Sequence, residues 1–241
     1  MSVSRLTLHV VERIQLSSAL LRLVLKGDLA DYPEPQAGAP LKIWVPTPAG
    51  EVARTYTVRE FDRAAQRMTI DFVLHDQPGP ACDWARQAGL GATLTISGPK
   101  APRAWPDKIS HYCFAGDLSA LPAIAAQVEQ LDPQAEGWVA LQIQDLEERV
   151  YFTHPAGVQV QWLLPDGQPQ QLQRWAQRLD LKPDTLLWVA AEHDEVVGLR
   201  DWARQDLGWP RSHVHAVPYW RRDVDEEIYH DQRHQVMADD E

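Results

Sequence analysis

Arg54-Thr55-Tyr56-Thr57-Val58-Arg59 is the stretch of this 241-residue chain that says most about its fold. It lies between two segments that are expected to be strands, residues 41–45 and 67–74. An arginine, an aromatic ring and hydroxyl groups alternate along it with the period of two that is typical of a strand. The first, third and fifth residues then share one face, and the other three share the opposite face. We therefore expect a strand here, with the flanking segments as further strands.

Three side chains of this stretch suit one kind of ligand. The Arg54 guanidinium can give a pyrophosphate two parallel, charge-assisted hydrogen bonds. The ring of Tyr56 can lie flat on a tricyclic aromatic system, and Thr57 can hydrogen-bond an edge nitrogen of that system. Together these residues indicate a flavin site. An amphipathic strand with solvated arginines explains the hexapeptide equally well.

A second feature follows the strand that is expected to end at Leu74. Gly79-Pro80 predicts a turn that opens into a helix near Ala81. The first backbone N–H groups of a helix have no partner within it, and they attract anions. Arg54 and this helix start are therefore expected to hold one pyrophosphate from two sides.

The first part of the chain, residues 3–99, predicts a barrel. Short segments in which apolar and polar residues alternate are separated by turns rich in proline and glycine, and they include one short helix. Leu21, Leu23 and Leu25 show the alternation clearly. Such a series is typical of a closed antiparallel β-barrel.

The period changes after Pro99, and residues 100–108 are the expected linker. Strands expected at 111–115, 138–143, 158–164 and 186–190 alternate with helices expected at 119–131, 168–179 and 195–207. This alternation is typical of a parallel α/β sheet. The predicted fold has two domains, an antiparallel β-barrel at residues 1–101 and an α/β parallel-sheet domain with a C-terminal tail at residues 102–241.

The composition excludes several classes of protein. The net charge is −11 and lysine and arginine form no basic stripe, so no nucleic-acid partner is expected. No apolar run could span a membrane, and the first residues do not resemble a signal peptide, so no membrane insertion is expected. Cys82 and Cys113 cannot build a disulfide framework, which is typical of a cytoplasmic protein. The nine histidines complete no recognised ligand spacing, so no metal site is expected.

From about residue 3 to about residue 234, the chain resembles the siderophore-interacting proteins, flavin-dependent ferric-siderophore reductases of the ferredoxin-reductase-like superfamily. The matching residues are, in order, Arg54-Thr55-Tyr56-Thr57-Val58-Arg59, His75, Gly79-Pro80-Ala81, Trp84-Ala85, Gly98-Pro99, Gly116-Asp117, Ala120-Leu121-Pro122-Ala123 and Tyr219-Trp220-Arg221. The ordered set is more specific than any one motif. The resemblance implies reduction of ferric siderophores, with FAD as cofactor and NADPH, NADH or ferredoxin as electron donor.

The resemblance also implies which residues bind the cofactors. They are Arg54, Tyr56, Thr57, Val58, His75, Pro80, Ala81, Cys82, Trp84, Gly116, Asp117, Ser119, Glu192 and Trp220. No protein residue is expected to be catalytic, because the flavin carries the redox chemistry. Three residues depart from the family pattern. Cys82 replaces a serine or threonine, which bears on phosphate contact; Leu118 replaces an acidic residue and Ala191 a glycine, which bear on nicotinamide binding.

Several of these assignments have a structural alternative. The turn at Gly116-Asp117 lacks the glycine fingerprint of dinucleotide sites, and Ser119 also suits a helix N-cap. Glu192 either contacts the nicotinamide ribose or adds polarity to a loop. An aromatic residue near the chain end shields the flavin in related proteins, and either Tyr219 or Trp220 suits that role or a place in the core.

An anionic ferric siderophore requires basic residues near the flavin edge. Lys42 lies beside the flavin strand and is matched in the family, although a lysine on a strand is often simply solvated. The other candidates for the substrate are Lys100, Arg103 and Arg221.

Two other functions fit the same architecture. One is a general NAD(P)H-flavin or ferredoxin reductase, and the ordered match around Pro80, Trp84 and Trp220 argues against it. The other is a non-enzymatic siderophore-binding module that has lost its flavin, and the intact flavin motif argues against it.

Overall fold

The computed structural model describes residues 5–74, 79–101, 105–106, 109–224 and 228–229. The chain divides into two compact units, and each is described by itself. The first unit comprises Met1–Arg103, Pro122–Gln130 and Glu147–Thr153. The second comprises Ala104–Leu121, Leu131–Leu146 and His154–Glu241.

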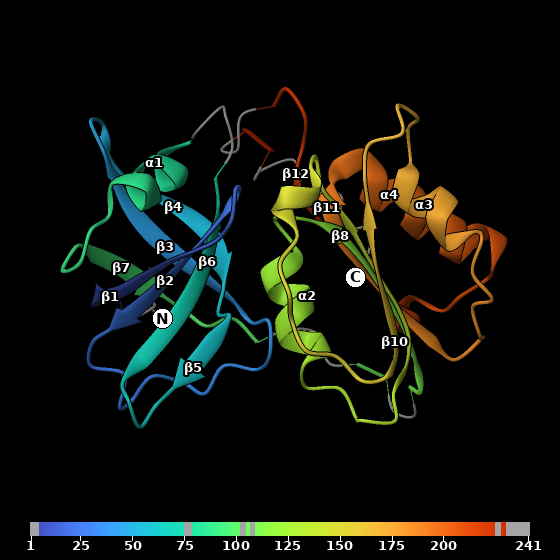
Figure 1. The fold of residues 1–241 in the computed structure, drawn as a ribbon, viewed down its shortest axis with the longest axis horizontal. Helices are drawn as coiled ribbons and strands as arrows, with labels where there is room; N and C mark the ends of the chain where they lie inside the picture. Colours follow the sequence, from blue (N-terminus) through green and yellow to red (C-terminus); the bar gives the residue numbers. More distant parts are fainter. Residues whose placement is uncertain (1–4, 75–78, 102–104, 107–108, 225–227, 230–241) are drawn as a thin grey trace. The chain divides into compact units, whose positions relative to one another are not determined.

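The first unit is built on a seven-stranded antiparallel sheet (Figure 1). Its strands are β1 (Arg5–Ser17), β2 (Leu20–Lys26), β3 (Pro40–Thr47), β4 (Gly50–Thr57), β5 (Glu60–Asp62), β6 (Arg67–Val73) and β7 (Thr93–Ser97). Their order is β4-β3-β7-β1-β2-β6-β5. The alternation that predicted these strands reflects burial, since Leu21, Leu23 and Leu25 are fully buried in the core.

The sheet curls so that strands far apart in its order come together. The order places four strands between β4 and β6, yet the rings of Tyr56 on β4 and Phe72 on β6 lie 4.6 Å apart. Aromatic side chains therefore close the gap around a single core. The antiparallel architecture predicted for this part of the chain is confirmed.

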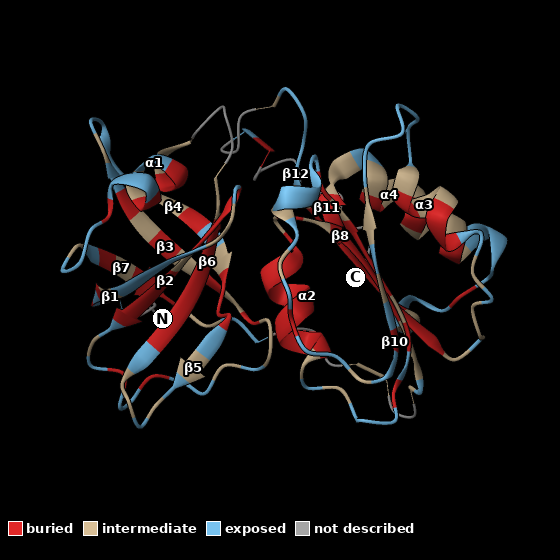
Figure 2. Cartoon of the chain, viewed as in Figure 1, coloured by how far each residue is buried: buried red, intermediate tan, exposed pale blue. Residues whose placement is uncertain are grey.

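Two helices belong to the first unit. The helix α1 (Pro80–Gln87) follows β6, and α2 (Leu121–Val128) begins at the division between the units. The helix α2 is shorter than the helix expected at 119–131. The last residues of that expected range form a turn instead, in which the Gln130 N–H bonds the Gln127 carbonyl. Figure 2 shows α2 as almost entirely buried.

The second unit is built on a five-stranded parallel sheet in the order β10-β9-β8-β11-β12. The strands are β8 (His111–Asp117), β9 (Glu136–Gln142), β10 (Gly157–Leu163), β11 (Thr185–Glu192) and β12 (Val214–Trp220). The helices are α3 (Gln171–Ala176) and α4 (His193–Asp201), a π-helical turn η2 (Trp202–Asp206) and a 3₁₀ turn η3 (Arg211–His213). A second 3₁₀ turn, η1 (Leu146–Glu148), lies at the division between the units, with Glu147 and Glu148 in the first. The predicted parallel α/β fold is confirmed.

The helices α3 and α4 pack on one face of this sheet (Figure 1). The expected helix at 168–179 is reduced to α3, because Gln170 precedes it with a left-handed φ of 53°. The carboxylate of Glu195, on α4, accepts hydrogen bonds from the backbone N–H groups of Gln171 and Leu172 at 3.0 and 2.9 Å. One helix thus caps the other. Among the described residues, no helix is both long and apolar enough to cross a membrane.

Candidate functional site

Arg54 and Tyr56 share one face of β4, as the sequence predicts. In the ladder between β3 and β4, Arg54 pairs with Ile43 and Tyr56 with Leu41, both of which are core residues. Arg54 is only 8% exposed, whereas Thr55 is exposed and Thr57 is buried. The arginine of the motif therefore lies on the inner side of the sheet.

The prediction that the strand continues through Arg59 is wrong. The strand β4 ends at Thr57, and the Val58 N–H bonds the Ala39 carbonyl. The Arg59 N–H then bonds the Thr69 carbonyl on β6. At this point the chain leaves its partner β3 and joins β6, so the alternation of faces no longer applies.

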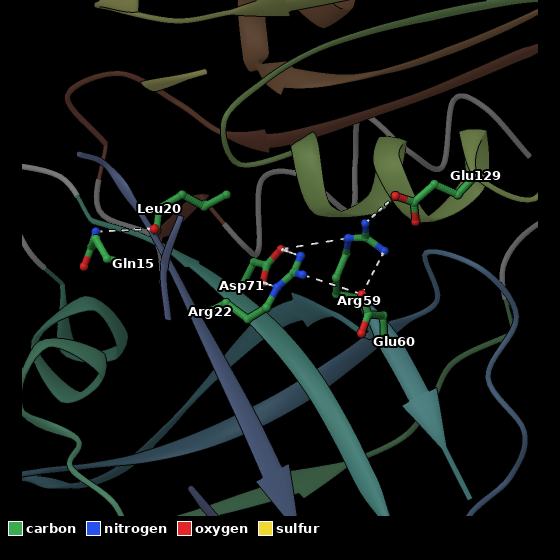
Figure 3. Close-up of polar contacts among 7 residues, drawn as sticks. All are labelled: Gln15, Leu20, Arg22, Arg59, Glu60, Asp71 and Glu129. Carbon is green, nitrogen blue, oxygen red and sulfur yellow. Dashed lines mark hydrogen bonds and ion pairs between the residues drawn. The ribbon is translucent and has the colours of Figure 1, made fainter. Parts of the chain in front are cut away.

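Arg59 is buried in a network of charged side chains, shown in Figure 3. Its guanidinium lies 2.7 Å from a Glu129 carboxylate oxygen on the turn after α2, 3.8 Å from Glu60 and 4.0 Å from Asp71. Arg22 forms two parallel hydrogen bonds, of 2.7 and 2.9 Å, with the buried Asp71. These contacts give Arg59 a structural role that sequence alternation could not reveal.

Tyr56 and Trp84 meet through Phe72. The Phe72 ring lies 4.6 Å from Tyr56 and 5.7 Å from Trp84 on α1, measured between centroids. The two halves of the predicted flavin site, the strand and the helix, therefore lie side by side in one unit.

The helix α1 begins where the sequence predicts. Gly79 is the N-cap, Pro80 occupies the first turn, and the Asp83 N–H bonds the Gly79 carbonyl at 3.0 Å. Ala81 and Cys82 are buried, and their backbone N–H groups lie in the first turn, before the intrahelical ladder starts. An added Cβ at Gly79 would meet no described atom within 4 Å. A buried arginine and a helix start with no described atom against its N-cap glycine fit a flavin with two phosphates. His75 lies outside the described residues.

Three strands of the second unit end at one edge of the sheet and bring together the residues assigned to the nicotinamide cofactor. Gly116 and Asp117 end β8, Glu192 ends β11, and Trp220 ends β12. Oδ2 of Asp117 accepts a hydrogen bond of 2.7 Å from the indole Nε1–H of Trp220. Oδ1 of Asp117 accepts from both the N–H and the hydroxyl of Ser119.

Asp117 is half-buried at this edge of the sheet. Burial raises the pKa of its carboxyl above the ordinary 3.8, and the hydrogen bonds from Ser119 and Trp220 lower it in part. The hydrogen bonds from Ser119 and Trp220 therefore stabilise the charged form of the Asp117 carboxyl.

Glu192 has a structural role in addition to the two that the sequence suggested, which were a contact with the nicotinamide ribose and polarity in a loop. It is the N-cap of α4, and its Oε2 accepts from the Asp194 N–H at 2.7 Å. Its Oε1 accepts from the Arg222 N–H at 3.2 Å, which fastens the segment after β12. Next to it, His193 Nδ1 lies 3.0 Å from the hydroxyl of the buried Tyr229. Sequence reasoning missed this last contact, for which no local pattern exists.

The basic residues assigned to the substrate lie in different places. Lys42 pairs with Thr55 and Ser97, so it faces away from the Arg54 side of the sheet. Lys100 is exposed, and its N–H bonds the Pro40 carbonyl near the start of β3. Arg221 is an exposed residue of the second unit. Arg103 lies outside the described residues. Within the described part of the chain, no group of His, Cys, Asp and Glu could hold a metal ion.

Comparison with known proteins places this geometry in a family. Residues 50–103 match the siderophore-interacting FAD-binding domain, and residues 109–223 match the siderophore-interacting protein model. The ferric vibriobactin reductase ViuB of Vibrio cholerae is 33% identical over 97% of this chain and 95% of its own length. The chain belongs to the siderophore-interacting protein family.

Other relatives agree with this membership. The crystal structure of the siderophore-interacting protein SipS from Aeromonas hydrophila superimposes with a TM-score of 0.90 at 36% identity, covering 98% of this chain and 99% of SipS. The NADPH-dependent ferric-chelate reductase of Escherichia coli is 29% identical over 89% of this chain and 91% of its own length. Phthalate dioxygenase reductase, at 16% identity and a TM-score of 0.63, shares the fold; the match covers 89% of this chain and 68% of that one.

Proposed function

We propose that this protein is an FAD-dependent reductase that uses NAD(P)H to reduce ferric siderophore complexes and releases iron(II). The observation that carries the proposal is the meeting of Tyr56 and Trp84 around Phe72. It joins the strand of Arg54 to the start of α1, within the residues that match the family's FAD-binding domain. The names of the relatives from Vibrio cholerae and Escherichia coli support the reaction.

On this proposal, the first unit holds FAD. Arg54 and the backbone N–H groups of Ala81 and Cys82 hold the pyrophosphate, while Tyr56 and Thr57 meet the ring. Val58, His75, Pro80 and Trp84 complete the site. When bound, FAD accepts a hydride and passes on single electrons. The protein binds and orients the reactants, and no acid or base of the chain is required for the iron step.

The second unit holds the nicotinamide dinucleotide at the carboxyl edge of its sheet, where α/β sheets bind ligands. Gly116, Asp117, Ser119, Glu192 and Trp220 form this part of the site. We propose residues 1–101 as the flavin domain and residues 102–241 as the dinucleotide domain, although Pro122–Gln130 and Glu147–Thr153 fold as part of the first compact unit. We further propose that the protein acts in the cytoplasm, where NAD(P)H is available.

The substrate is an anionic ferric chelate, attracted by Lys42, Lys100, Arg103 and Arg221. A protein of net charge −11 repels anions at long range, so local basic groups are needed. Oxygen-donor chelators hold iron(II) less tightly than iron(III), because the charge is smaller and the ion softer. Reduction therefore frees the metal.

The test is an anaerobic titration of the purified protein. We expect a yellow protein whose visible flavin absorbance is bleached by NADPH or NADH and restored by a ferric siderophore. Iron(II) should appear at the same time in a complex with an iron(II)-specific chelator. A colourless protein would favour the non-enzymatic binding module. A flavin that is reoxidised by ferredoxin or free flavin and not by ferric siderophores would favour the general reductase.

A further inference from the structure

The side chains of Asp117 and Trp220 connect two strand ends that are not neighbours. The strands β8 and β12 each pair with β11, which lies between them. Strands two places apart are separated by about 10 Å, yet the indole N–H of Trp220 reaches Oδ2 of Asp117 at 2.7 Å. The indole therefore crosses the carboxyl end of β11, where Glu192 is the register partner of Trp220.

Trp220 is held at this edge without being buried. It is 40% exposed, so core packing alone does not fix its ring. A hydrogen bond to a carboxylate is charge-assisted and directional, and it fixes the ring in one orientation. An exposed indole that is already ordered offers flat apolar surface, and a ligand that stacks on it need not order the ring itself.

Asp117 is poorly suited to bind the dinucleotide directly. Oδ1 already accepts two hydrogen bonds from Ser119, and Oδ2 accepts the one from Trp220. A carboxylate is an acceptor and carries negative charge, so it repels a pyrophosphate. The contribution of Asp117 to binding must then pass through a neighbour.

We propose that Asp117 is a positioning residue, which holds the indole of Trp220 as a platform for an aromatic ring of the nicotinamide dinucleotide. The inference rests on the proposed function, from which it takes the dinucleotide. The ring is the nicotinamide or the adenine, which share this stacking chemistry.

The first experiment measures the link without any ligand chemistry. The protein has ten tryptophans, and Trp220→Phe identifies the indole N–H signal of Trp220 in a nitrogen–proton correlation spectrum of ¹⁵N-labelled holoprotein. In Asp117→Ala that signal should move upfield and exchange faster with water, while the others stay in place. An unchanged Trp220 signal would overturn the proposal.

The second experiment measures the dissociation constant of NADP⁺ by calorimetry on the flavin-loaded protein. Asp117→Ala and Trp220→Phe should each weaken binding by about three- to tenfold, the effect of one hydrogen bond. The double variant should bind no more weakly than Trp220→Phe alone. Equal dissociation constants for wild type and both single variants would overturn the proposal. So would a further loss in the double variant, because Asp117 would then act directly on the ligand.

Gln161→Ala is the matched control, because it removes a similar indole hydrogen bond, from Trp175 at 2.8 Å, elsewhere in the second unit. It should leave the dissociation constant unchanged; a loss equal to that of Asp117→Ala would mean that general loosening explains both.

Nicotinamide mononucleotide and 2′,5′-ADP, titrated separately, show which ring stacks, since only that fragment should be sensitive to Trp220→Phe. If wild type binds neither NADP⁺ nor NAD⁺, the proposed donor fails and the platform fails with it. The link between Asp117 and Trp220 is still decided by the spectrum.

Discussion

Arg59 Nη2 and Glu129 Oε1 lie 2.7 Å apart, and this contact joins the end of the flavin motif to the turn that follows α2 (Figure 3). The Arg59 side chain is only 7% exposed, and Asp71 beside it only 3%. Two arginines and three carboxylates form one network here, so removing one charge leaves its partners without their counter-ion. The members are Arg22, Arg59, Glu60, Asp71 and Glu129.

Replacing the two arginines of the motif should therefore give opposite phenotypes. Arg59→Ala should lower the free energy of unfolding by about 3–5 kcal/mol, because it leaves buried carboxylates without their partner. Arg54→Ala should instead weaken flavin retention by about 1.5–3 kcal/mol, the value of a charge-assisted phosphate contact. Denaturant unfolding and the ratio of flavin to protein measure the two effects.

Glu34→Ala is the control for stability, since Glu34 pairs with Arg63 at the surface and its loss should cost much less. Equal flavin occupancy in Arg54→Ala and Arg59→Ala would contradict the assignment of Arg54 to the phosphate.

The flavin released from the protein should be FAD and not FMN. Arg54 and the start of α1 are two phosphate-binding features, and two phosphates satisfy both. Heat release followed by chromatography against standards identifies the flavin. A preparation that contains FMN alone would refute the two-sided contact.

His193 should make stability depend on pH. Burial, with a contribution from Arg221, lowers the pKa of His193 below 6.5. The folded protein then binds fewer protons at this residue than the unfolded chain. Its contribution to the free energy of unfolding is therefore complete above about pH 6.5 and is lost as the pH falls through the lowered pKa.

The variant His193→Asn, which cannot be protonated, isolates this effect. Urea unfolding between pH 5 and 8 at saturating FAD should show wild type losing stability relative to the variant on acidification. Parallel curves across that range would show that protonation of His193 does not change the free energy of unfolding.

Lys42→Glu should slow reduction of an anionic ferric siderophore and leave flavin content nearly unchanged. Lys42 faces away from Arg54 and Tyr56, so a new charge there does not enter the flavin face. Its effect should fall on kcat/KM at low ionic strength and shrink with added salt, because exposed charges are screened beyond about 8–10 Å at 0.1–0.15 M. Steady-state assays at two salt concentrations measure it.

The control is Lys26→Glu, which makes the same charge change at the exposed end of β2. A neutral ferric chelate should be affected less than an anionic one. If both chelates lose activity equally at both salt concentrations, Lys42 is structural, and the substrate site moves to Arg103 and Arg221.

Local patterns predicted the elements of this fold, and long-range contacts decided what their side chains do. Alternation placed Arg54 and Tyr56 on one face correctly, because a ladder to β3 runs alongside them. The same rule failed at Arg59, where the chain exchanges β3 for β6. Residues 117 and 220 are 103 positions apart, and no period or motif relates them.

The ends of helices were predicted less well for the same reason. The helix α3 starts at Gln171 because Glu195, 24 positions away, caps its backbone. Likewise, the sequence does not identify Glu192 as an N-cap, because it does not show that α4 begins at His193. Such ends depend on partners that lie elsewhere in the chain.

The placement of α2 bears on how reductases of this kind can be recombined. The first compact unit takes Pro122–Gln130 from the middle of the sequence, and Glu129 in that segment neutralises Arg59. A chimera that exchanges everything after residue 101 between two relatives therefore imports a foreign α2 against the native sheet. Hybrid enzymes should inherit a working flavin half only when the donor of α2 also supplies an acidic residue at position 129. In this protein, the unit of exchange is then discontinuous, and a crossover point chosen from the linker alone would break it.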